Sequence, residues 1–173
     1  MKKYAYFLII FGTIIFCTSG YAQSDKYIYN SAQEAMAQGD RDFAFMHFRS
    51  LLRFSPNSRY YKKALFATGE YYFTNGDYYD AEKIFSQLIE SYPENEALPF
   101  AIMYLLKIDQ LYNQEQASNL KKQVIQFKQL SLLFSEFKEY SYTSPLNYKY
   151  KAIYFIDRVE FYINGELFEE IYF

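Results

Sequence analysis

The chain has 173 residues and a formal net charge of −2, and 51% of its residues are hydrophobic against 22% charged. This balance excludes a disordered tail, because such segments are poor in apolar residues and rich in net charge. A single cysteine excludes a disulfide-stapled scaffold, and the lack of excess basic residues argues against nucleic acid as the main partner.

The first 22 residues have the three parts of a secretory signal peptide. Lys2 and Lys3 precede an apolar run over residues 4–16, and small residues up to Ala22 supply a cleavage site. The run is shorter than the roughly 20 residues that span a bilayer, although an uncleaved anchor stays an alternative. We expect cleavage after Ala22 and an exported chain, in the periplasm or on the periplasmic face of the outer membrane.

Cys17 raises the question of lipidation, because bacterial lipoproteins are cut directly before a cysteine that then carries lipid. Their motif needs a small residue in front of that cysteine, and this chain has Phe16 there. The sequence therefore favours Cys17 as an ordinary apolar residue of the signal. Lipidation at Cys17 stays the alternative route to a membrane.

An internal repeat with a spacing of 37 residues begins after the signal. Each copy has apolar residues at steps of three and four, the period of one helix face, on both sides of a glycine-aspartate pair. Glycine ends one helix, aspartate starts the next and proline closes the unit, so each copy predicts a hairpin of two helices. The aligned pairs are Gly39 with Gly76, Asp40 with Asp77, Ala44 with Ala81, Phe48 with Phe85, Leu51 with Leu88 and Pro56 with Pro93.

This hairpin resembles the tetratricopeptide repeat, in which small residues such as Gly69 and Ala81 stand where the two helices approach most closely. The stretch from about residue 26 to residue 93, with its Pro56-Asn57-Ser58 link, is similar to the amino-terminal half of the BamD (YfiO) family of outer-membrane assembly lipoproteins. The Tol-Pal-associated periplasmic repeat proteins are similar in the same stretch. The absence of a lipoprotein motif is the main departure from BamD.

The second half of the chain repeats less clearly. Residues 98–112 predict a helix with Pro99 in its first turn, and an apolar stripe from Leu120 to Phe137 predicts a long helix. Ser144 and Pro145 are expected to start the next element. The last residues admit two interpretations: a decayed third repeat, or a β-hairpin with a turn at Asn164-Gly165.

We favour the helical interpretation, and therefore an all-α fold. In this prediction residues 23–97 are two tetratricopeptide-like repeats in a short right-handed superhelix, and residues 98–173 are a helical region with a decayed third repeat.

Catalytic groups are scarce. His47 is the only histidine, and the chain has no metal-loop, nucleophile-elbow or phosphate-cradling motif. We expect no enzyme activity, no cofactor and no metal site. An envelope enzyme or carbohydrate-acting accessory that uses surface carboxylates stays an alternative.

A binding function has better support, because the first helix of each hairpin in such repeats lines a concave face. Aromatic side chains beside polar ones on that face suit an extended peptide or a partner helix. The alternative is that Phe66 and Phe73 pack against the neighbouring hairpin. The resemblance to BamD implies an adaptor that docks a component of β-barrel assembly. The candidate partner-binding residues are Lys26, Tyr29, Gln33, Met36, Lys63, Phe66, Glu70 and Phe73.

The signal peptide makes a prediction about processing. We expect the chain isolated from the cell envelope to begin at Gln23, with a mass that globomycin treatment of the cells does not change. Intact-mass spectrometry and amino-terminal sequencing check both points. Accumulation of a precursor under globomycin would instead assign lipid to Cys17.

Overall fold

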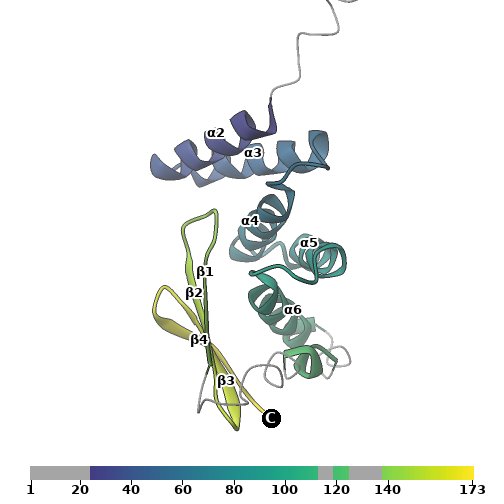
Figure 1. The fold of residues 1–173 in the computed structure, drawn as a ribbon, viewed down its shortest axis with the longest axis vertical. Coiled ribbons are helices and arrows are strands. Elements are labelled where there is room, and N and C mark those ends of the chain that lie inside the picture. The colour runs from purple at the N-terminus through teal and green to yellow at the C-terminus, as the bar shows by residue number, and fades with distance from the viewer. Residues whose placement is uncertain (1–23, 113–118, 125–137) are drawn as a thin grey trace, which may run out of the picture.

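The computed structural model describes residues 24–112, 119–124 and 138–173. The predicted signal peptide, Cys17 and most of the expected long helix between residues 114 and 139 lie outside the described residues. The described part consists of paired helices followed by an antiparallel sheet (Figure 1).

The helices confirm the predicted hairpins. Helix α2 packs against α3 and α4 packs against α5, and α6 follows where residues 98–112 predicted it (Figure 1). Residues 119–124 are also helical. The bounds are α2 (Asp25–Ala37), α3 (Arg41–Phe54), α4 (Tyr61–Thr74), α5 (Tyr78–Ser91) and α6 (Leu98–Tyr112).

The turns inside the two hairpins are alike in backbone but not in capping. Gly39 and Gly76 have φ of 81° and 82°, a conformation that favours glycine. The Asp40 carboxylate accepts a hydrogen bond from the Phe43 N–H at 3.0 Å, as expected of an amino-terminal cap. Asp77 occupies the same position before α5 but its side chain makes no capping bond. The two copies of the repeat therefore match more closely in backbone geometry than in side-chain hydrogen bonds.

The prediction of an all-α chain is wrong for the last part of the chain, which folds as a four-stranded antiparallel sheet instead of a decayed repeat. The strands are β1 (Lys138–Thr143), β2 (Lys149–Tyr154), β3 (Arg158–Ile163) and β4 (Glu166–Tyr172), in the order β1-β2-β3-β4. Asn164 and Gly165 have φ of 53° and 88°, which matches a two-residue hairpin turn. Burial alternates along β2 and β3, so the governing period is two and not 3.6.

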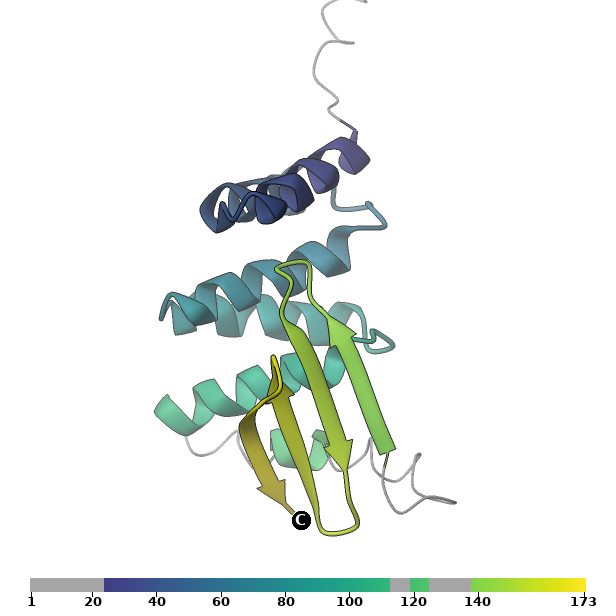
Figure 2. The ribbon, with the colours of Figure 1, turned by 90° about the vertical axis from the view of Figure 1, so that its left-hand side faces the viewer.

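The sheet packs its buried face on α4 and α6; it lies edge-on beside them in Figure 1 and in front of them in Figure 2. Aromatic rings from both layers fill this core, which accounts for much of the aromatic content of the chain. A second cluster lies between α2, α3 and α4. The fully buried aromatic side chains of the main core are Phe66, Phe85, Phe100, Tyr104, Tyr150, Tyr154 and Phe161.

Gly69 allows α4 and α5 to approach closely. A Cβ atom at this position would lie 2.8 Å from Cε1 of Phe85, whose ring is held by stacking on Tyr104 at 4.9 Å. We expect Gly69→Ala to lower the free energy of unfolding by about 1 to 2 kcal/mol, because overpacking outweighs the better helix propensity of alanine. Urea unfolding followed by circular dichroism measures the change. Phe85→Leu should make room for the methyl group, so an equal cost of Gly69→Ala in both backgrounds would contradict this account.

Candidate functional site

The face predicted to bind a partner is covered by the chain's own sheet. Phe66 and Glu70 on α4 are fully buried, and Phe73 is half-buried. The ring of Phe66 lies 5.5 Å from that of Tyr150 on β2, and the ring of Phe73 lies 6.2 Å from that of Phe168 on β4. Both phenylalanines also pack on Tyr104 of the next helix, α6, whose ring lies 6.3 Å from that of Phe66 and 4.6 Å from that of Phe73. The packing alternative is therefore realised, by α6 and the sheet together.

The turn between β1 and β2 points toward α2 (Figure 1) and contacts it. The Gln33 side-chain amide donates a hydrogen bond to the Pro145 carbonyl at 3.1 Å, and Leu146 is buried in the cluster of α2, α3 and α4. The Arg41 guanidinium lies 5.1 Å from the centre of the Tyr148 ring. The expectation that Ser144 and Pro145 start the next element is wrong, because they lie at the tip of the hairpin and β2 begins at Lys149.

The other predicted residues lie at the margin of this contact. Lys26 is exposed, whereas Tyr29, Met36 and Lys63 are half-buried. Tyr29 stacks on Tyr60 at a ring separation of 4.2 Å. The structure thus places Phe66, Glu70 and Phe73 beneath the sheet and Gln33 against the turn between β1 and β2, and it leaves the remaining four at the margin. Partner binding by these residues stays a prediction.

A buried hydrogen-bond cluster centres on Glu70. Its Oε1 accepts hydrogen bonds from the Tyr150 hydroxyl and, at 3.0 Å, from the Ser144 hydroxyl. The Tyr104 and Tyr150 hydroxyls are 2.6 Å apart, so the cluster links α4, α6 and β2. Ser144 also accepts a hydrogen bond from the Tyr148 N–H at 3.2 Å, which ties the hairpin tip to the same carboxyl group.

Burial dominates the electrostatics of this cluster. It raises the pKa of Glu70 from its ordinary 4.5 to about 8, although the hydrogen bonds from Tyr150 and Ser144 act in the opposite direction. Burial and the nearby Glu70 also raise the pKa of Tyr150 well above its ordinary value. The Glu70 carboxyl group is therefore largely neutral near pH 7, which makes its burial beneath the sheet tolerable.

The other side of the helical array carries an open groove, which we call the outer groove. It has a volume of about 610 Å³ and runs between α3 and α5, with α4 as its floor. Tyr61, Thr68 and Tyr72 line the floor, while Met46 and Phe54 stand on one wall with exposed fractions of 61% and 68%. This groove was not among the sites predicted from the sequence. The signal was present in α3, where large apolar residues recur outside the buried stripe.

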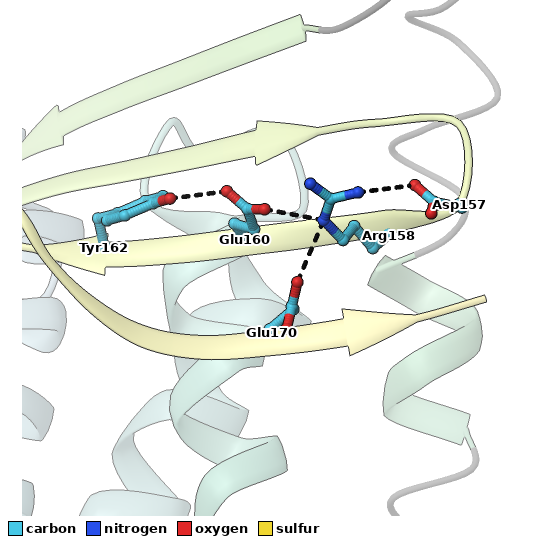
Figure 3. A network of polar contacts seen from close by, with 5 residues as sticks. All are labelled: Asp157, Arg158, Glu160, Tyr162 and Glu170. Carbon is cyan, nitrogen blue, oxygen red and sulfur yellow. Dashed lines mark hydrogen bonds and ion pairs between the residues drawn. The ribbon is translucent and has the colours of Figure 1, made fainter.

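A second polar cluster occupies the sheet face opposite the helices (Figure 3). Nε of Arg158 lies 2.8 Å from Glu160 and 3.1 Å from Glu170, and its Nη1 lies 3.2 Å from Asp157. The Tyr162 hydroxyl donates to Glu160 at 2.6 Å, and this bond, together with Arg158, lowers the pKa of Glu160. Each charged group already has a partner on its own or the neighbouring strand. The cluster therefore fixes the pairing of β3 with β4 and offers no open ligand position.

Within residues 24–112, 119–124 and 138–173, no group of three or more histidine, cysteine, aspartate or glutamate side chains is placed to hold a metal ion. In the same part of the chain, no helix has the length and apolar character needed to cross a bilayer.

A comparison with known proteins adds no identification: no protein-family model matches the chain, and neither does any curated protein. The resemblance of residues 26–93 to the BamD family therefore stays a prediction from the repeat residues.

The buried Glu70 predicts an unusual dependence of stability on pH. Because the folded state keeps a proton that the unfolded chain loses above pH 4.5, the stabilisation is complete below that pH and falls as pH rises toward 8. The loss amounts to roughly 3 to 5 kcal/mol over this range. Glu70→Gln keeps the neutral shape and the acceptor oxygen. The free energy of unfolding of this variant should therefore fall less between pH 4.5 and pH 8, and the variant should be more stable than the wild-type chain at pH 8.

Urea unfolding at several pH values between 4.5 and 8.5 measures this effect. Glu34→Gln on the exposed surface of α2 is the matched control and should leave the decline intact. Parallel pH profiles for the wild-type chain and Glu70→Gln would contradict the assignment.

Proposed function

We propose that the protein is a non-catalytic adaptor of the bacterial cell envelope that holds a protein partner on tetratricopeptide-type helical hairpins. The resemblance of the repeat to the BamD family supports this proposal, and so does the pairing of α2 with α3 and of α4 with α5. A component of β-barrel assembly is the partner class that this resemblance implies. The predicted signal peptide would bring the chain to the compartment where such a partner is found.

The outer groove is the observation that carries the proposal. The concave face of the helices, where such arrays commonly bind, is filled by the sheet of the same chain. The outer groove stays open and combines exposed apolar side chains with charged ones. Monomeric proteins seldom leave large apolar side chains grouped in a groove unless a partner covers them. We therefore propose partner binding on this side, because Phe66, Glu70 and Phe73 of the predicted concave face contact the sheet instead.

Site-specific photo-cross-linking in living cells tests the proposal. A photoreactive phenylalanine analogue replaces Met46 or Lys83 in the outer groove, and Leu167 on β4 serves as an exposed control position. We expect an adduct with one envelope protein from both groove positions and none from position 167. Mass spectrometry should identify the adduct as a β-barrel assembly component. Absence of any adduct from the groove positions would refute the adaptor function proposed for this face.

A further inference from the structure

We infer that the outer groove binds an acidic amphipathic helix of a protein partner. This inference rests on the proposed adaptor function and specifies the chemistry of the segment that docks. It follows from the shape of the groove, from its apolar anchors and from an excess of positive charge that makes no ion pair among the described residues.

The shape suits a helix because both walls are themselves helices. On α3 the lining residues Met46, Ser50 and Phe54 recur every four positions, and on α5 Asp80, Ile84 and Gln87 recur at steps of four and three. The stripe on α3 covers eight residue steps, or about 12 Å at the rise of an α-helix. A partner helix of roughly two to three turns would therefore match the walls, in the helix-in-groove mode of recognition.

Apolar anchors stand at both ends of the α3 wall. Met46 and Phe54 are among the most exposed large apolar side chains of the helices, and Leu52 and Ile84 continue the apolar surface as half-buried residues. Methionine adapts to varied partners, while phenylalanine offers a rigid anchor. An amphipathic segment would cover these side chains with its own apolar stripe.

The charge of the groove indicates that the partner segment is negatively charged. Arg49, Arg53 and Lys83 line it, against a single lining carboxylate, Asp80. Among the described residues none of these four side chains makes an ion pair; instead Arg49 and Arg53 lie over phenylalanine rings at 5.5 and 5.2 Å. This basic groove belongs to a chain whose net charge is −2. Glutamate or aspartate beside the apolar stripe of the partner would complement it.

A second copy of this chain fits the groove less well than an acidic partner. In a two-fold symmetric pairing the same surface faces itself, so Arg49, Arg53 and Lys83 would approach like charges. The lipid headgroups of an anionic membrane would pair with these positive charges. A groove between two helices, however, exposes its apolar side chains to a narrow ligand such as a helix better than to a flat membrane surface. Both occupants are outcomes that the following test distinguishes.

Fluorescence anisotropy with designed peptides tests the inference on the full mature chain. The probe is a labelled helical peptide of about 14 residues with a leucine stripe flanked by glutamates, and its partner peptide has lysine at every glutamate position. We expect the acidic peptide to bind at least tenfold more tightly than the basic one. Its affinity should weaken as salt is added, because exposed charges are screened.

Charge reversal in the groove provides the decisive comparison. Arg49→Glu combined with Arg53→Glu should weaken the acidic peptide at least tenfold and strengthen the basic peptide, a reversal that misfolding could not produce. Lys121→Glu combined with Lys149→Glu changes the net charge equally at exposed positions away from the groove and should leave the preference unchanged. Circular dichroism verifies that both double variants fold.

Three outcomes would overturn the inference. The first is equal affinity for the two peptides, and the second is an affinity for the acidic peptide that changes less than twofold when the arginines are reversed. The third is that the arginine reversal weakens binding to phosphatidylglycerol vesicles but not binding to the peptide. Self-association lost on the same reversal would assign the groove to a second copy. A cross-linked envelope partner at positions 46 and 83 that tolerates the arginine reversal would refute this inference while leaving the adaptor function intact. Loss of every groove adduct would refute the adaptor function itself.

Discussion

The contact between α4 and the sheet decides how the rest of the molecule is arranged. Phe66 packs on Phe85 within the α4–α5 hairpin, and β2 covers both Phe66 and Glu70 through Tyr150. Burying one phenylalanine is worth about 1.5 to 3 kcal/mol, and here the neighbouring rings of α6 and the sheet are buried with it. The helices and the sheet therefore share one core and are not separate units joined by a linker.

Glu70 sets the condition under which this core is stable. A charged carboxylate at full burial would need compensation that two hydroxyl donors do not supply, so the neutral acid is the form that fits. Ser144 and Tyr150 reach Glu70 only when the β1–β2 hairpin is in place. The hydrogen bonds to this carboxyl group therefore form only when the sheet is packed on the helices. The same interaction explains why the concave face, the usual binding surface of helical repeats, is filled from within the chain.

Filling one side of the array leaves the other side for partners. The outer groove lies on the walls of α3 and α5, whose opposite faces hold the hairpins together through Phe48 and Phe85. Each of these helices therefore has a buried stripe and a separate exposed stripe. The polar cluster around Arg158 has a different purpose, because its charges are used to join β3 and β4. Arg49, Arg53 and Lys83, which make no ion pair among the described residues, instead line the outer groove.

The sequence alone determined the local elements whose signals are local: the 37-residue repeat, the glycine turns, the helix over residues 98–112 and the close approach at Gly69 all follow from spacing and side-chain size. It left the last strands ambiguous, because Asn164-Gly165 suits both a helix turn and a hairpin, and only pairing with β2 and the core selects the strand period. It also could not show that the sheet covers Phe66 and Glu70, since their partners on the β1–β2 hairpin lie more than 70 positions away in the chain. Which face of the helices remains open was decided by tertiary structure, because burial depends on what the distant sheet packs against.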